Sequence, residues 1–438
     1  MGTVVMISQL ILALAILITF HEWGHFQTAR WFGIRVDKFY LFFDAWGKKL
    51  FKFKKGDTEY GIGWLPLGGY VKIAGMIDES MDKEFLDKEP EPWEFRSKPA
   101  WQRLIVMIGG VTVNIVLGVL IYTGIKFVYG ESYHPMESIE HGIVAYDLGQ
   151  ELGFETGDNV ISVNGIKPEK FEDLTNPDVL LNEGVYEVER GGDVITITLP
   201  EDLAENLRDN PIFGIRTLLQ VDTVIAGSSA EKAGMQKGDI ITKVADSTIR
   251  FFHEIVPFLG RRKGQEVPMV VNRNGNEKTL MVAIGAKGTD NAGKIGFAPK
   301  SNVEYEKFGL GQSFVRGFES SFSLLMVNIK ALGKVVTGKV NPVKTVSGPI
   351  GIATMFGENW VWLRFWSLTG ALSMILAFMN ILPIPALDGG HVFFLLIEMI
   401  RGKALSDKAL ERAQIVGFVI LLTLMVLIFG NDIYQLFQ

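Results

Sequence analysis

Residues 3–25, TVVMISQLILALAILITFHEWGH, decide the fold of this chain, because an apolar run long enough to cross a lipid bilayer continues into a His-Glu-x-x-His motif. His21 and His25 are one helical turn apart, so their imidazoles project from the same face and can hold a single metal ion. Such polar side chains are costly in apolar sequence unless they are paired or metal-bound. The stretch therefore predicts a metal site at a membrane-spanning helix, with Glu22 as its general base.

The composition predicts a multi-pass membrane protein. Of 438 residues, 48% are hydrophobic and only 21% are charged, which is too apolar for an ordinary soluble protein of this length. The first apolar run lacks a preceding basic region and a small-residue cleavage site, so we interpret it as a retained helix rather than a signal peptide. We expect about four transmembrane helices, near residues 3–20, 104–129, 365–399 and 413–430.

The charge pattern and the cysteine content restrict the chemistry. The formal net charge is −6 and the Lys and Arg residues are scattered among acids, so no basic stripe follows a phosphate backbone and no nucleic-acid partner is expected. The chain has no cysteine, so a transition-metal site must use His and carboxylate ligands. Zn²⁺ accepts these ligands and is the predicted cofactor.

Basic residues near the spans predict the orientation of the chain. Lys and Arg cluster at 30–38 and 96–103, between the first two spans, and again at 401–412, between the last two. By the positive-inside rule these connections face the cytoplasm, which places both termini and residues 131–304 outside. Lys126 and Arg364 oppose this orientation unless they snorkel to the interface.

A catalytic zinc needs three protein ligands and one open position, so a third ligand must lie elsewhere in the chain. The third apolar segment is interrupted by NILPIPALDGGH at 380–391, whose prolines and glycines cannot continue a regular helix. Non-helical backbone at membrane depth is tolerated where protein buries it or water reaches it, as in an active site. Asp388 is the preferred ligand from this stretch, and His391, which begins the next helical run, is the competing candidate.

Residues 38–75 alternate apolar residues with polar residues or glycine, which predicts a small membrane-associated β-sheet on the cytoplasmic side. Within it, GIGWLPLGGYVKIAGM at 61–76 predicts a β-hairpin. The charged, proline-bearing stretch at 77–101 predicts an exposed loop that leads to the second span.

A transmembrane substrate must be unwound before its peptide bonds can be attacked, and an added β-strand is one way to hold it. The hairpin glycines, including Gly68 and Gly69, are candidates for that edge, and Asn380, Pro383 and Pro385 are candidates for the opposite wall. The alternative is that the glycines only form turns and the prolines only end a helix.

Residues 131–300 contain an internal repeat, in which GFETGDNVISVNG at 153–165 matches GMQKGDIITKVADS at 234–247. Each copy has a Gly-Asp turn before an apolar strand and a later strand pair. The copies resemble PDZ domains, although the second lacks the final Asn-Gly. We therefore expect two tandem α/β modules that bind peptide segments in grooves, with PIFGIR and PFLGRR as candidate groove edges.

Phenylalanines at 314, 318 and 322 predict an amphipathic helix on the membrane surface, although a helix packed on a neighbouring domain would give the same pattern. The predicted division of the chain is 1–37 (first transmembrane helix), 38–100 (sheet and loop), 101–130 (second helix), 131–215 and 216–300 (PDZ-like modules), 301–345 (amphipathic region), 346–400 (interrupted third span) and 401–438 (fourth helix and C-terminus).

Together these motifs resemble the site-2 protease family. The resemblance rests on HEWGH at the end of the first helix, NILPIPALDGG in a broken later helix, the segment at 61–76 and the PDZ-like modules, and it covers essentially the whole chain. It implies that His21, His25 and Asp388 bind zinc, which decides against His391. It also implies a bacterial inner-membrane protein with periplasmic PDZ-like modules and an active site towards the cytoplasm.

The function implied is that of an intramembrane zinc endopeptidase. Its substrates would be single-span membrane proteins such as an anti-sigma factor, or remnant signal peptides, with membrane lipid as the other partner. The alternative is a PDZ-bearing membrane adaptor with a structural or inactive zinc site. Glu22 argues against the adaptor, because a structural site needs no base beside its ligands.

Overall fold

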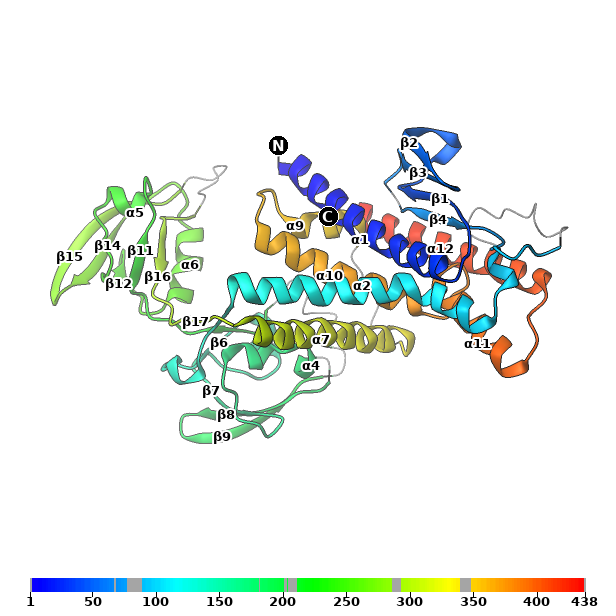
Figure 1. The fold of residues 1–438 in the computed structure, drawn as a ribbon. Helices are drawn as coiled ribbons and strands as arrows, with labels where there is room; N and C mark the ends of the chain where they lie inside the picture. Colours follow the sequence, from blue (N-terminus) through cyan, green and yellow to red (C-terminus); the bar gives the residue numbers. More distant parts are fainter. Residues whose placement is uncertain are drawn as a thin grey trace. The chain divides into compact units, whose positions relative to one another are not determined.

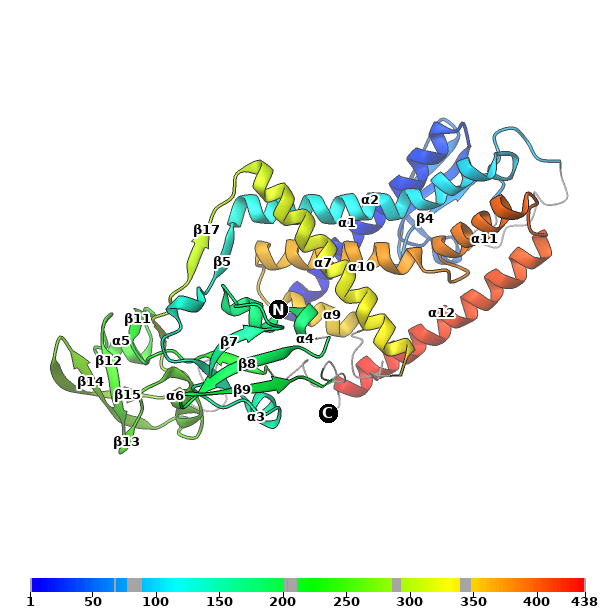
Figure 2. The same ribbon diagram turned by 90° about the horizontal axis from the view of Figure 1, so that it is seen from below.

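The computed structural model describes residues 2–66, 68–76, 89–180, 182–200, 203, 211–285, 293–338 and 348–436. Residues 77–88 of the predicted exposed loop therefore lie outside the described residues, as does the end of the amphipathic region. The chain forms two compact units, one of Met1–Glu131 with Lys307–Gln438 and the other of Ser132–Glu306 (Figures 1 and 2). Each is described below by itself.

The first unit is built around helix α2 (Ala100–Tyr129), whose main packing partners in the described part of the unit are also helices. These are α1 (Gly2–Trp31), α7 (Leu310–Val336), α10 (Trp362–Ile381) and α11 (Asp388–Arg401). Two further helices, α9 (Pro349–Phe356) and α12 (Asp407–Leu436), complete the described part of the unit. Among the described residues, four segments are long and apolar enough to cross a membrane, the number that the sequence predicts: Gly2–Trp31, Ala100–Tyr129, Trp362–Ile381 and Lys408–Asp432. The third ends at Ile381, before the end of the predicted span at 365–399.

Close approach of α1 and α2 depends on glycine. A Cβ atom added at Gly24 would overlap the backbone of Gly109, and one added at Gly109 would lie 2.7 Å from the carbonyl oxygen of Gly24. Small residues at such a crossing let two helix backbones touch, as is common between transmembrane helices. The contact holds the His-Glu-x-x-His turn of α1 directly against α2.

Helix α7 packs on α2 through small residues rather than through its aromatic side. Ser313 and Ser321 are fully buried, and a Cβ atom at Gly317 would meet the backbone of Thr123 at 2.5 Å. Phe314 and Phe318 are exposed. Packing against a neighbour, one of the two alternatives left by the sequence, is thus observed, and contact with a membrane surface stays a prediction.

The predicted sheet is present, with four strands in the order β2-β3-β1-β4. The strands are β1 (Val36–Leu41), β2 (Lys49–Lys55), β3 (Thr58–Gly63) and β4 (Tyr70–Ile73). The predicted hairpin at 61–76 is wrong, because β3 and β4 do not pair with each other. Strand β1 lies between them, parallel to β3 and antiparallel to β4.

The interruption of the third span is a tight loop at residues 382–387 between α10 and α11. Pro383 and Pro385 lack the backbone N–H groups that a helix needs, and Ala386 has a φ of 79°, which is unusual for a residue with a side chain. Gly389 and Gly390 let the loop fold back on the start of α11, since a Cβ atom at Gly390 would lie 2.6 Å from the carbonyl oxygen of Ile384.

The second unit has two hydrophobic cores, one in each half of its sequence. Phe154, Tyr186 and Phe213 stack edge to face in the first core, whereas aliphatic residues such as Met269 and Val271 fill the second. The first half contains β6 (Ile143–Ala145), α3 (Asp147–Glu151), β7 (Asn159–Val163), α4 (Pro177–Leu180), β8 (Val185–Arg190), β9 (Asp193–Thr198) and β10 (Phe213–Ile215). The second contains β11 (Val221–Val224), α5 (Ser229–Lys232), β12 (Ile240–Val244), β13 (Ser247–Thr248), α6 (Phe252–Gly260), β14 (Glu266–Arg273), β15 (Asn276–Ala283) and β16 (Phe297–Pro299).

The first half contains the sheet β7-β8-β9 and a separate pair of strands, β10 with β6. The second half contains the sheet β13-β12-β14-β15 and a separate pair, β11 with β16. Strands β5 (Glu131–Tyr133) and β17 (Glu304–Glu306) also pair. PIFGIR forms β10, but PFLGRR is not a strand edge: it ends helix α6, because Phe252, Ile255 and Leu259 recur at helical spacing on the core side.

The same buried ion pair stabilises both Gly-Asp turns. Asp158 accepts hydrogen bonds from the backbone N–H of Glu155 and from Arg190, which also donates to the carbonyl oxygen of Gly153. In the second copy, Asp239 accepts from the backbone N–H of Gln236 and from Arg273, which also donates to the carbonyl oxygen of Gly234. The Gly-Asp pattern thus encodes one local geometry twice.

Replacing Asp239 by Ala is expected to destabilise the second half by about 3 kcal/mol, because it leaves Arg273 without its buried partner. Burial alone raises the pKa of Asp239, but the Arg273 guanidinium overcomes this and holds the pKa below its usual range. The Asp239–Arg273 pair therefore stabilises the folded wild type at neutral pH. This stabilisation is lost as the pH falls, from about 4 down through the lowered pKa of Asp239.

Hydrogen exchange of residues 219–285 in the full chain measures this loss. Asp222→Ala, which removes the exposed pair with Lys237, is the control and should cost less than about 1 kcal/mol. Equal protection in the Asp239 variant and the wild type would show that the buried pair does not stabilise the turn.

Candidate metal centre

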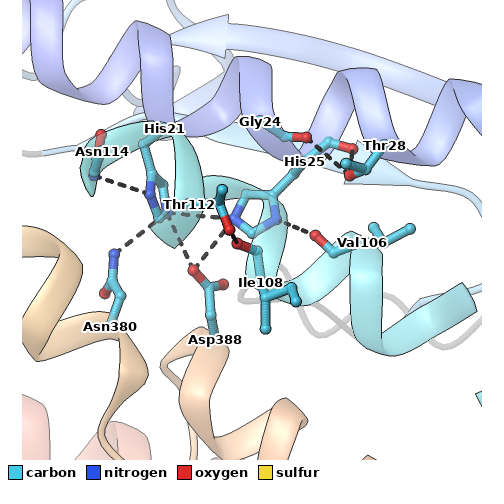
Figure 3. Close-up of polar contacts among 10 residues, drawn as sticks. All are labelled: His21, Gly24, His25, Thr28, Val106, Ile108, Thr112, Asn114, Asn380 and Asp388. Carbon is cyan, nitrogen blue, oxygen red and sulfur yellow. Dashed lines mark hydrogen bonds and ion pairs between the residues drawn. The ribbon is translucent and has the colours of Figure 1, made fainter. Parts of the chain in front are cut away.

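Three potential metal ligands from two distant parts of the sequence meet at one point (Figure 3). Nε2 of His21 lies 3.3 Å from Nε2 of His25, and both nitrogens lie 3.2 Å from Oδ2 of Asp388. Both histidines are buried on α1, while Asp388 is the first residue of α11. Within the described ranges, these residues form the group of His and carboxylates that is close enough to share a metal, and His391 is outside it.

The spacing of these atoms fits zinc. Ligands about 2.1 Å from a tetrahedral zinc lie about 3.4 Å from one another, close to the separations found here. Two imidazoles and one carboxylate are a known ligand set for catalytic zinc and leave the fourth position open. The donor set and its geometry therefore both suit the metal.

The other nitrogen of each imidazole is held by α2, which orients both rings. Nδ1 of His25 lies 2.8 Å from the carbonyl oxygen of Val106, so it carries the proton and leaves Nε2 free as a ligand. Nδ1 of His21 lies 3.2 Å from the Asn114 amide, whose buried Oδ1 has no partner in the described part of the structure. Rotating this amide by 180° would let Oδ1 accept the His21 proton, which is what a metal on Nε2 requires.

Glu22 lies between the two histidines in sequence and is partly exposed at the site. Strand β4 packs against α1, and the backbone N–H of Val71 in this strand faces the Glu22 carboxylate. The sheet thus holds the candidate base beside the metal ligands. Asn380, at the end of α10, places its amide nitrogen 3.3 Å from Nε2 of His21, on the side of the ring that faces the ligands.

The other residues predicted to bind substrate are two glycines before β4 and two prolines of the loop at 382–387. Gly69 packs on α1 and β1, since a Cβ atom there would lie 2.6 Å from Ile18 and 2.7 Å from the Tyr40 carbonyl oxygen. Gly68 has a φ of 153° and lies against the Phe43 ring. Pro383 is exposed and Pro385 is half-buried.

Sequence reasoning missed the contribution of α2. A Cβ atom at Gly110 would overlap the imidazoles of His21 and His25, so only glycine leaves space for them. The carbonyl oxygen of Asn114 accepts a hydrogen bond from the Ser373 hydroxyl, which ties α10 to the same turn. A glycine pair and an asparagine inside an apolar span, GGVTVN at 109–114, were the available signal.

Apolar helices that surround two histidines, a carboxylate and an adjacent glutamate define a membrane-embedded metallopeptidase. The sequence pattern described as "Peptidase family M50" matches residues 9–424, and the chain belongs to this family. It is therefore a zinc-dependent protease, as the motifs predicted, and the family does not favour the adaptor alternative.

Relatives match over nearly their whole lengths. The regulator of sigma E protease of Haemophilus influenzae is 28% identical over 98% of this chain and 99% of its own. The regulator of sigma-E protease RseP of Escherichia coli is 29% identical over 98% of each chain. A Neisseria meningitidis protein whose name describes a zinc metalloprotease is 28% identical over 97% of this chain and 98% of its own. These names agree with the narrower resemblance of the motifs, to the bacterial regulator of sigma-E protease.

Gly417 on α12 is expected to be needed for placing Asp388. A Cβ atom at Gly417 would overlap the Pro385 carbonyl oxygen, three residues before the ligand. We expect Gly417→Ala to displace the loop at 382–387 and to lower peptide cleavage about a hundredfold, because small displacements of a catalytic group have effects of this size. Zinc affinity should fall as well.

Gly430→Ala is the matched control, because a Cβ atom at that position on the same helix meets no atom of the described residues within 4 Å. Zinc content and cleavage rate are measured for both variants in detergent. If Gly417→Ala had the zinc content and the cleavage rate of the wild type, α12 would not be needed to position the loop at 382–387.

Proposed function

We propose that this protein is an intramembrane endopeptidase that cleaves the transmembrane segment of single-span membrane proteins. The observation that carries the proposal is the meeting of His21 and His25, on a helix long and apolar enough for a bilayer, with Asp388, which follows a second such helix, α10. Glu22 lies beside them in the sequence. Relatives named as regulators of sigma-E protease point to an anti-sigma factor as one substrate. Remnant signal peptides are a second substrate class of the same chemistry.

The proposed mechanism assigns each step to residues of this centre. His21, His25 and Asp388 would hold the zinc ion, which when bound would act as a Lewis acid that activates water near neutral pH and polarises the scissile carbonyl. Glu22 accepts the proton of the attacking water and returns it to the leaving amine. The amide of Asn380 donates a hydrogen bond to the carbonyl oxygen as negative charge develops there.

The substrate must reach the site as an extended chain, because a helix keeps its peptide bonds in internal hydrogen bonds. Strand β4 is an edge of the sheet, begins directly after Gly68 and Gly69, and packs against the helix that carries Glu22. We assign this edge as the place where an unwound substrate adds as a strand. Asn380, Pro383 and Pro385 would line the opposite wall.

The proposed location is a bacterial inner membrane, with residues 131–300 in the periplasm and the metal centre towards the cytoplasm. The positive-inside distribution of Lys and Arg supports this orientation. The two halves of the second unit, with their equivalent Asp–Arg pairs, support an assignment as tandem PDZ-like modules that bind peptide segments.

Cleavage of a tagged single-span protein by the purified protein in detergent tests the proposal. We expect a cut within the hydrophobic segment, located by mass spectrometry, that a zinc chelator abolishes and added Zn²⁺ restores. Cuts confined to the soluble part of the substrate, or cleavage that persists in the chelator, would contradict an intramembrane metallopeptidase.

A further inference from the structure

Strand β2 is the other edge of the sheet and carries an unusual exposed surface. Its sequence KLFKFKK alternates lysine with large apolar residues. Leu50, Phe51 and Phe53 are 71%, 57% and 50% exposed, and β3 is the neighbour of β2 among the described strands. An exposed apolar edge strand promotes aggregation unless something covers it.

Two tryptophans extend this apolar surface. Trp46, which precedes β2, is 83% exposed and stacks on Trp64 at 5.6 Å between ring centroids. The indole N–H of Trp64 donates to the carbonyl oxygen of Ala45, which supports the pair. Trp46 has a φ of 55°, a conformation rarely adopted by bulky residues, so the turn presents the ring outward at a conformational cost. Exposed tryptophans are typical of membrane–water interfaces.

Several lysines lie beside these rings, and they outnumber the acidic residues that could pair with them. Lys49 is paired with Glu59 at 2.8 Å, and Lys52 approaches the same carboxylate at 3.9 Å. Lys48, Lys54 and Lys55 are exposed and have no ion-pair partner within the described ranges. Glu59 also accepts from the Tyr40 hydroxyl, and Asp44, which is 3.8 Å from Lys49, accepts from the Tyr70 hydroxyl. Asp57 lies in the turn after Lys55. The surface is therefore both apolar and cationic.

The aromatic face of β2 is continuous with a transmembrane helix. Phe53 stacks on Tyr60 of β3 at 5.2 Å, and Tyr60 contacts Phe26 of α1 at 6.1 Å. Phe26 also contacts Phe39 of β1 edge to face. One apolar face thus runs from α1, which is long and apolar enough to span a membrane, to the exposed edge of the sheet.

We propose that this β2 surface, formed by Trp46, Trp64 and residues 48–55, binds the interfacial region of the bilayer and selects anionic phospholipid headgroups. Aromatic rings enter the interface while lysine ammonium groups pair with headgroup phosphates. A second copy of the chain is the poorer occupant, because antiparallel pairing of two β2 edges would place lysines opposite lysines. The proposal rests on the membrane-spanning helices and not on the peptidase chemistry, so its failure and that of the proposed function are separable.

The absence of cysteine allows a direct test, because a single introduced thiol can carry a fluorophore. Phe51→Cys and, as the reference position in the second unit, the exposed Glu277→Cys are labelled with bimane in the full chain. Both are reconstituted in nanodiscs of brominated phosphatidylcholine, with or without an equal amount of phosphatidylglycerol. We expect bromine quenching at position 51 but not at 277, and about twofold stronger quenching at 51 in the anionic discs.

Charge-matched variants identify the lysines. Combined Lys48→Gln, Lys54→Gln and Lys55→Gln in the Phe51→Cys protein should remove the difference between anionic and neutral discs. The same number of exposed lysines changed in the second unit, Lys167→Gln, Lys243→Gln and Lys278→Gln, should leave it intact. Equal quenching at 51 and 277, equal quenching in both lipids for the unaltered surface, or disulfide cross-linking between two unlabelled Phe51→Cys chains would overturn the proposal.

Discussion

Replacing Glu22 by Gln is expected to leave zinc bound and to lower the rate of peptide cleavage about a thousandfold. The glutamine amide cannot take a proton from water, and general bases of this kind contribute about 10²- to 10⁴-fold to the rate. The variant keeps His21, His25 and Asp388, and a glutamine side chain has nearly the size and shape of glutamate. The chemical step should therefore be lost while the site stays assembled.

The measurement pairs zinc content, by atomic emission, with single-turnover cleavage of a single-span peptide. Glu319→Gln, an exposed change on α7, is the control and should behave as the wild type. Cleavage by Glu22→Gln within about tenfold of the wild type would remove Glu22 from the role of base. Loss of zinc from this variant would instead assign Glu22 to holding the site together.

Replacing Asp388 by Ala is expected to lower zinc affinity at least about a hundredfold and to abolish cleavage. Loss of a residue that only orients a ligand costs about 10- to 100-fold in affinity, so loss of a ligand should cost more. Asp388 Oδ2 is 3.2 Å from each histidine nitrogen, whereas His391 is not in the group that could share the metal. His391→Ala is therefore the matched comparison and should keep its zinc.

Competition with a chelator of known affinity measures both constants in detergent. The pair of variants separates the two candidates that the motif alone left open. If His391→Ala bound zinc weakly and Asp388→Ala bound it normally, His391 and not Asp388 would be the third zinc ligand. Normal binding in both variants would require a third ligand outside this loop.

Several features could be predicted from sequence because they depend on residues close together in the chain. Helical periodicity alone places His21 and His25 on one face, and the length of each apolar run predicts a span. The Gly-Asp turns also repeat because each is a local structure, closed by a carboxylate that bonds to a backbone N–H three residues earlier.

The strand order was not predictable in the same way. Residues 61–76 have the composition of a hairpin, yet β1 pairs with both β3 and β4 and separates them. Pairing partners depend on which segment α1 and the loops bring alongside, and strand alternation carries no information about that choice.

By itself, the sequence determined the class of this protein: apolar spans, a His-Glu-x-x-His turn and a proline-broken segment with a carboxylate, each of which follows from local chemistry. Only the tertiary structure decided how these parts form one site. It brings Asp388 to the histidines, the Asn114 amide to His21, strand β4 to α1 and Gly417 to the ligand loop. The reason is physical: these contacts join segments far apart in the chain, and they depend on how closely helices and strands pack rather than on any local pattern.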